Sequence, residues 1–184
     1  MVKVITKQDF SDETLKLEEN VLVFRNCYFE RVHLKVKVKK IFFYDCLGDI
    51  YLENSLVESI AFLKSNVTIK NIHKIEKLSL SNSKINVETT ADKLFQYSIY
   101  FWKIKVDKGS TLTLSSVICY CEHLFLTNHS LLLMDNLTSY IHKKGKICQL
   151  DVKNLVSITS EIKNKKIKDE EYSYFILNDE IMFD

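Results

Sequence analysis

The sequence contains no proline, only three glycines and, apart from Ala61 and Ala91, no alanine. It also lacks Asn-Gly and Asp-Gly pairs, the dipeptides that most often form the two-residue turns of β-hairpins. An antiparallel sandwich or barrel joins many short strands by such turns, so their absence argues against both folds. Lys, Ile and Asn are abundant instead. This bias is typical of an AT-rich genome and indicates a low-GC bacterium or a phage as the source.

Long apolar segments are also missing. No stretch of about eighteen uncharged apolar residues occurs, so the sequence predicts no membrane-spanning helix. Residues 1–20 lack the apolar segment of a signal peptide, and we therefore expect a cytoplasmic protein. The five cysteines are an odd number, which predicts reduced thiols rather than a disulfide framework.

Neither sign of charge predominates. The 184 residues include 26 basic and 24 acidic side chains, and the net charge is +2. This balance gives no overall attraction to nucleic acid or to an anionic membrane, and it argues against both as partners. The hydrophobic fraction of 46% is that of a folded protein, and the length fits a single domain.

A degenerate repeat is the strongest pattern in the sequence. Each copy contains an apolar alternation, a small polar break and a second alternation. The leading apolar residues of the first four copies are separated by 19, 19 and 18 positions and are Leu22, Ile41, Ile60 and Leu78. Looser copies follow at residues 99–106, 112–118, 124–133 and 147–158.

This repeat predicts a parallel β-solenoid. Its length is that of one solenoid coil. The period of two within each copy is typical of a strand, and Asn, Asp or Ser at the break suits a tight corner. The sequence therefore predicts an all-β, single-domain solenoid of seven to eight rungs. We assign residues 1–19 to an N-terminal cap, 20–162 to the rungs and 163–184 to a C-terminal cap or tail.

Stacking of the copies predicts ladders of equivalent residues. Cys27 is expected to lie over Cys46, and the latter to be buried. Three phenylalanines at equivalent positions, Phe24, Phe43 and Phe62, are expected to stack in one column.

The segment Phe24–Val32, with the sequence FRNCYFERV, resembles pentapeptide-repeat proteins and right-handed parallel β-helix proteins. The resemblance extends over residues 20–90, although the strict five-residue register is lost within one coil. It implies the solenoid architecture and no functional residues. Such folds include both carbohydrate-active enzymes and binding proteins, so the fold alone does not identify a function.

Two groups of residues are candidates for chemistry. Cys119, Cys121 and His123 alternate along an expected strand, where all three would face the same side. Thiolates and imidazole suit zinc, but Cys-x-Cys on a flat strand directs its ligands in parallel, and buried cysteine is a common core residue. Asp45 and Asp49 lie near one corner, but the first is explained by the turn and no basic residue accompanies them. We therefore predict no metal, no cofactor and no catalytic residue.

Two segments are candidates for binding a partner. Lys35, Lys37 and Lys39 alternate with apolar residues and form a basic stripe on the outer face of one coil. A solvated face that discourages strand pairing explains the stripe, and contact with phosphate is the alternative.

The second segment, residues 95–102, carries apolar residues on both strand faces. Some of its aromatic side chains must therefore point outward or be covered. Aromatic residues are favoured anchors of protein interfaces, and the candidate anchors are Phe95, Tyr97, Tyr100 and Trp102. In the alternative, these rings lie under residues 88–93.

These observations favour a non-enzymatic protein-binding module. A more specific version of this hypothesis is a phage or mobile-element inhibitor of a host protein. Two alternatives belong to other classes. A carbohydrate-active β-helix enzyme would need an exposed groove with converging carboxylates. A self-assembling structural solenoid would need uncapped ends.

Overall fold

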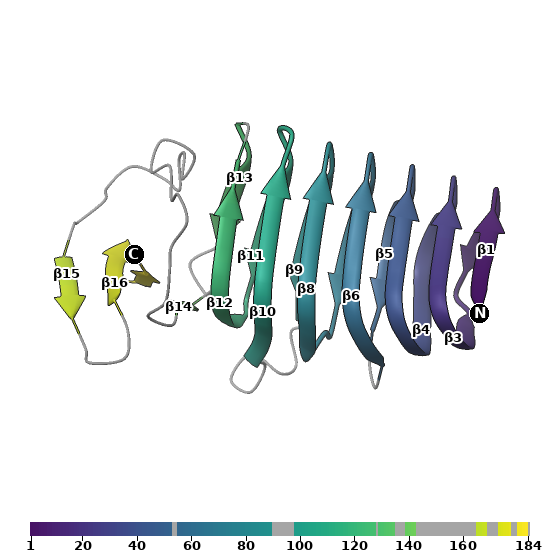
Figure 1. Ribbon diagram of the computed structural model, residues 1–184, viewed down its shortest axis with the longest axis horizontal. Helices are drawn as coiled ribbons and strands as arrows, with labels where there is room; N and C mark the ends of the chain where they lie inside the picture. The colour runs from purple at the N-terminus through teal and green to yellow at the C-terminus, as the bar shows by residue number, and fades with distance from the viewer. Residues whose placement is uncertain are drawn as a thin grey trace.

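The computed structural model describes residues 1–52, 55–89, 98–127, 129–134, 139–142, 165–168, 173–177 and 180–183. Its strands stack in parallel, coil upon coil, into an elongated β-solenoid of about six turns (Figure 1). The described residues include no helix. The predicted all-β parallel solenoid is thus confirmed, with slightly fewer coils than the seven or eight expected. The last copy that the sequence predicts, residues 147–158, lies outside the described residues.

Two stacks of parallel strands form the walls of the solenoid. The long stack consists of β1 (Val2–Thr6), β3 (Thr14–Arg25), the second part of β4 (Tyr28–Tyr44), β6 (Leu56–Leu63), β8 (Lys74–Ser81), β10 (Ser98–Asp107), β12 (Ile118–Leu126) and β14 (Ser139–His142). The short stack consists of β2 (Asp9–Ser11), the first part of β4, β5 (Leu47–Tyr51), β7 (Asn66–Lys70), β9 (Lys84–Glu88), β11 (Thr111–Ser115) and β13 (Leu131–Met134). Strand β4 belongs to both stacks.

The two ends of the chain extend this pattern differently. At the N-terminus, β1 pairs in parallel with β3 and β2 with β4, so the segment assigned to a cap contributes strands to the stacks. Near the C-terminus, a separate antiparallel sheet is formed by β15 (Lys165–Lys168), β16 (Ser173–Leu177) and β17 (Glu180–Phe183). Strand β17 lies against β14, the last strand of the long stack.

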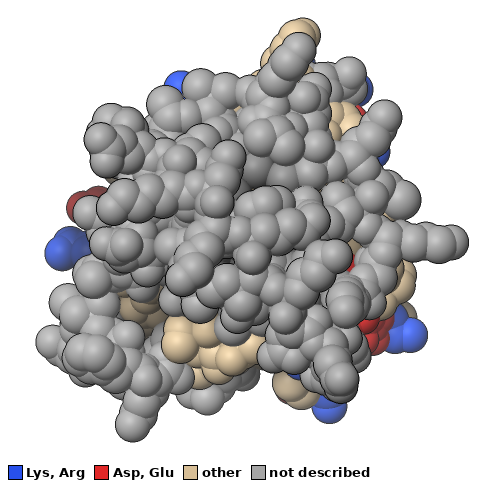
Figure 2. All heavy atoms as spheres, turned by 90° about the vertical axis from the view of Figure 1, so that its left-hand side faces the viewer, with Lys and Arg blue, Asp and Glu red and all other residues tan. Residues whose placement is uncertain are grey.

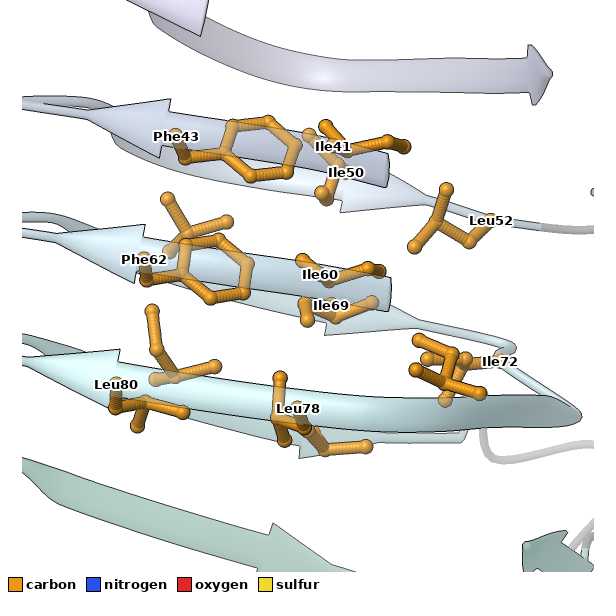
Figure 3. Packing of buried hydrophobic residues seen from close by; sticks show 14 of the residues in the cluster. Ile41, Phe43, Ile50, Leu52, Ile60, Phe62, Ile69, Ile72, Leu78 and Leu80 are labelled. Carbon is orange, nitrogen blue, oxygen red and sulfur yellow. The ribbon is translucent and has the colours of Figure 1, made fainter. Parts of the chain in front are cut away.

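The core lies between the two stacks and is built from columns of equivalent apolar residues (Figure 3). The rings of Phe24, Phe43 and Phe62 stack as predicted, with centroids 5.3 Å apart for the first pair and 4.8 Å for the second. The leading residues of the repeat are also register partners, Ile41 with Ile60 and Ile60 with Leu78. Each coil thus buries its inward side chains against the next coil.

The corner after each long strand explains the polar break in the repeat. Asn26, Asp45 and Asn82 all have φ near +50°, the left-handed conformation that short polar side chains tolerate. Lys64 occupies the same position in the third coil.

A small buried residue follows each of these corners. The Oγ of Ser65 accepts a hydrogen bond from the backbone N–H of Cys46 (3.0 Å), and Ser83 Oγ accepts one from the N–H of Ser65 (3.1 Å). Cys46 is fully buried, as predicted, and its thiol contacts the carbonyl oxygen of Phe24 at 3.5 Å. The cysteines Cys27 and Cys46 therefore occupy the position that serine fills in later coils, which gives them a structural role.

Candidate binding surface

The strands of the long stack bend near their middle, and the bend places two consecutive residues on the outer face. In β4, Val38 and Ile41 are buried, whereas Lys39 and Lys40 between them are exposed. The register on both sides of the bend is preserved from coil to coil. The first of these two residues in each coil belongs to what we term the corner column, which consists of Asn20, Lys39, Glu58, Glu76, Trp102 and Glu122.

A second outer column precedes the corner column by two residues. Its pairs are Glu18 with Lys37, Lys37 with Leu56, Lys74 with Tyr100, and Tyr100 with Tyr120. We term this set (Glu18, Lys37, Leu56, Lys74, Tyr100 and Tyr120) the flanking column. At roughly 4.8 Å per coil, the two columns form a continuous surface about 25 Å long, parallel to the solenoid axis.

An open groove of about 1090 Å³ follows these columns over the first four coils. Its apolar lining includes the exposed side chain of Leu56 and the buried Val57. Its charged lining has both signs. The acidic residues are Glu18, Glu19, Glu58 and Glu76, and the basic residues are Lys37, Lys39 and Lys74. Figure 2 views the molecule from its C-terminal end, where basic and acidic side chains are both visible around the rim.

The groove leads into a cluster of aromatic side chains on the fifth and sixth coils. Trp102 is 39% exposed, and its ring meets that of His123 edge-on at 5.2 Å. The hydroxyl of Tyr100 donates a short hydrogen bond to the Glu122 carboxylate. This hydrogen bond, together with burial, raises the pKa of Tyr100 to about 12.

The structure joins two candidate segments that the sequence treats as separate. Lys37 and Tyr100 belong to the flanking column, and Lys39 and Trp102 to the corner column. Lys35 is exposed on the same stack, two residues before Lys37. The remaining candidates, Phe95 and Tyr97, lie outside the described residues.

Several residues of this surface were missed by the sequence interpretation. Tyr120, His123 and Phe125 lie on β12, where the repeat is loose, and Lys103 lies on β10, after a longer connection. Lys77 directly precedes Leu78, so the regular spacing of the first four copies already places it one position before the leading residue of its coil. The spacing of the first coils does not extend through the longer connection before β10, so it could not place Lys103 and the residues of β12 beside Trp102.

The expectation that Cys119, Cys121 and His123 face the same side is wrong. Both cysteines point into the core and are buried, whereas the His123 ring lies on the outer face against Trp102. The bend at Glu122 causes the difference, because it interrupts the alternation between inward and outward side chains. Within the described ranges, no three His, Cys, Asp or Glu side chains are grouped so that they could hold a metal ion.

The described cysteines, Cys27, Cys46, Cys119 and Cys121, are buried and form no disulfide. Cys148 lies outside the described residues. Burial raises the pKa of the Cys46 thiol from 9.0 to about 11, and the negative charge that Cys27 and Asp45 would contribute also raises it. Burial likewise raises the pKa of Cys119 well above its ordinary value.

These shifts predict a loss of stability at alkaline pH. Between about pH 9 and pH 10 the unfolded chain releases its thiol protons while the folded protein retains them, so the free energy of unfolding falls, by up to about 1.4 kcal/mol per pH unit for each thiol. Urea unfolding followed by circular dichroism measures the decrease. The Cys46→Ser variant is expected to show a shallower decrease than the parent, and an equal decrease in the two proteins would contradict the prediction.

The corner residue Asp45 has positive φ, in agreement with its predicted role in the turn. The inference that no basic residue accompanies Asp49 is wrong, because the Lys70 ammonium lies 3.5 Å from its carboxylate and 3.3 Å from that of Glu88. Burial lowers the pKa of Lys70, but the carboxylates of Asp49 and Glu88 and the Tyr51 hydroxyl outweigh burial, and the net shift is upward. This network lies on the short stack, where the single ammonium of Lys70 bridges two carboxylates, as in a structural ion pair.

Comparisons with known proteins give no match, whether with family models, with curated proteins or with solved structures. In the described part of the chain, no helix has the length and apolarity needed to cross a membrane.

Proposed function

We propose that this protein is a non-enzymatic binding module whose partner is another protein, and that it binds along the corner and flanking columns. The observation that carries the proposal is the continuity of this surface, from the groove over the first four coils to the exposed ring of Trp102. A solenoid supports such a surface rigidly, because every coil is hydrogen-bonded to its neighbours. A closer relationship to pentapeptide-repeat proteins is part of the proposal and rests on the segment Phe24–Val32.

The charges of the groove favour a protein over a nucleic acid. Four carboxylates line it, and they would repel the phosphates of a strand that followed the solenoid axis. A protein surface offers both signs of charge together with apolar side chains, which suits the mixed lining and the exposed Leu56.

A carbohydrate-active enzyme is the second candidate, because Glu58 and Glu76 line the same groove. A general acid at neutral pH needs a carboxyl group whose pKa is raised by an apolar environment, whereas both of these side chains are exposed. The release of reducing ends from polysaccharides by the parent protein, abolished in Glu76→Gln, would favour the enzyme. Self-assembly, the third possibility, is tested by the sedimentation of purified protein over a range of concentrations.

The Tyr100→Ala, Trp102→Ala double variant tests the proposed surface. An exposed aromatic anchor contributes about 2 kcal/mol or more to binding, so we expect the affinity for the partner to fall roughly thirtyfold or more. The partner is first identified by mass spectrometry after capture from the source organism, and its affinity for purified protein is then measured by calorimetry.

A control variant separates lost binding from lost folding. Tyr28→Ala removes a similarly exposed aromatic ring, 46% exposed, from the short-stack part of β4. It is expected to bind the partner as the parent does. If the double variant melts at a much lower temperature, the rings belong to the core. If it melts normally and binds normally, the interface lies elsewhere.

A further inference from the structure

Three basic side chains lie side by side on neighbouring strands of the long stack. Lys77 on β8 is the register partner of Lys103 on β10, and Lys103 is the partner of His123 on β12. All three lie on the outer face, immediately after the corner column. Like charges directly opposite each other on adjacent strands are destabilising, so this arrangement has a cost unless another group compensates for it.

Aromatic rings rather than carboxylates hold the two lysines. The Lys77 ammonium lies 5.2 Å from the centre of the Trp102 ring, and that of Lys103 lies 4.4 Å from the centre of the Phe125 ring. Among the described residues, neither lysine has a carboxylate within ion-pair distance, whereas the nearby Lys105 lies 3.6 Å from Asp107. A cation over a ring is attracted by the electrons of the ring but keeps its full charge.

The geometry points to an anionic ligand at this place, and we propose that an acidic segment of the protein partner binds there, with its carboxylates on Lys77 and Lys103. This inference rests on the proposed function and names the chemistry of the partner. The rings restrict the lysine side chains before binding, so less conformational entropy is lost when a carboxylate arrives. His123 adds a further donor to the same site.

The same contacts disfavour a single-stranded nucleic acid. Bases bind such surfaces by stacking on free aromatic faces. Here a lysine already covers one face of Trp102 and one face of Phe125. The basic site is also short, and Glu76 and Glu122 of the corner column adjoin it, so a longer run of phosphates would meet negative charge.

The test uses as the probe a fluorescently labelled peptide in which two neighbouring glutamates are flanked by serine and glycine, at low ionic strength, with anisotropy as the measurement. The parent protein is expected to bind the peptide, and added salt to weaken binding. The Lys77→Gln, Lys103→Gln double variant is expected to bind about tenfold more weakly, the effect of losing two exposed ion pairs.

The chain offers a matched control in Lys16 on β3 and Lys84 on β9, which are also exposed lysines of the solenoid strands but lie over no described ring. The Lys16→Gln, Lys84→Gln variant makes the same change in net charge and is expected to bind the peptide within about twofold of the parent. Equal weakening in both double variants would overturn the inference, because it would reflect net charge alone. Tighter binding of a ten-residue oligothymidine, lost in the Lys77, Lys103 variant, would overturn it in favour of nucleic acid.

The natural partner distinguishes this inference from the proposed function. Suppose that the Tyr100, Trp102 double variant no longer binds the partner but the Lys77, Lys103 double variant binds it normally. This result would support the protein-binding function and contradict the proposal that an acidic segment of the partner binds Lys77 and Lys103. A partner that is bound normally by both variants contradicts both proposals.

Discussion

Replacing Gly48 with alanine is expected to destabilise the protein by more than about 3 kcal/mol and to leave little folded protein at physiological temperature. Gly48 has φ of +111°, a conformation that L side chains rarely adopt, and such backbone strain alone costs about 1–3 kcal/mol. A Cβ atom at this position would also overlap the carbonyl oxygen of Phe29 on the neighbouring coil. The two strands would have to separate where their register already shifts, between Phe29 and Val32.

Gly109→Ala is the matched control, because it adds the same methyl group at another glycine with positive φ. Gly109 has φ of +66°, and a Cβ placed there meets no atom within 4 Å. The preceding residue, Lys108, already adopts φ of +54° with a full side chain. We therefore expect a cost of only about 1–2 kcal/mol. Urea unfolding of the three proteins measures the difference, and similar losses in the two variants would show that the contact with Phe29 does not govern the stability of this corner.

The architecture of the first four coils could be predicted because each coil repeats the same physical problem. A thin coil buries its inward side chains only by stacking, so Ile41, Ile60 and Leu78 must be apolar and evenly spaced. The left-handed corner requires a residue that tolerates positive φ, which explains Asn26 and Asp45. These constraints are local, and they are therefore visible in one sequence.

The register of the later coils depends on a longer connection, and the sequence could not supply it. Leu78 pairs with Ile104, whereas the sequence pattern suggested that the corresponding copy begins at Ile99. The connection between β9 and β10 is longer than those before it, so the spacing of the earlier copies no longer identifies the partner.

The candidate surface was predicted in its parts but not as a whole. An alternating pattern indicates that Lys37 and Lys39 point outward, and an excess of aromatic residues marks the segment that includes Trp102. Whether the two share a face depends on the bend in the long strands, which adds an outward residue and changes the side on which later residues lie. The same bend separates His123 from Cys121, and nothing in the alternation reveals it.

Replacing Phe43 with alanine is expected to cost about 3–5 kcal/mol. Its ring is 1% exposed and is stacked between Phe24 at 5.3 Å and Phe62 at 4.8 Å. Phe29, on the opposite stack, packs edge-on against it at 5.8 Å. The backbones of the coils on both sides are joined by parallel ladders and have little freedom to move into the space, so the cavity remains open and the cost is near the upper end of the range.

The adjacent residue provides the control for this prediction. Phe42→Ala removes the same side chain from the same strand, but Phe42 is 40% exposed on the outer face. We expect a loss of at most about 1 kcal/mol, because little buried contact disappears and no cavity forms. Chemical denaturation of both variants tests the alternation directly. Equal losses would mean that the inward and outward faces of β4 are not distinguished as the stacked rings require, and a larger loss for Phe42 would place the core on the other face of the strand.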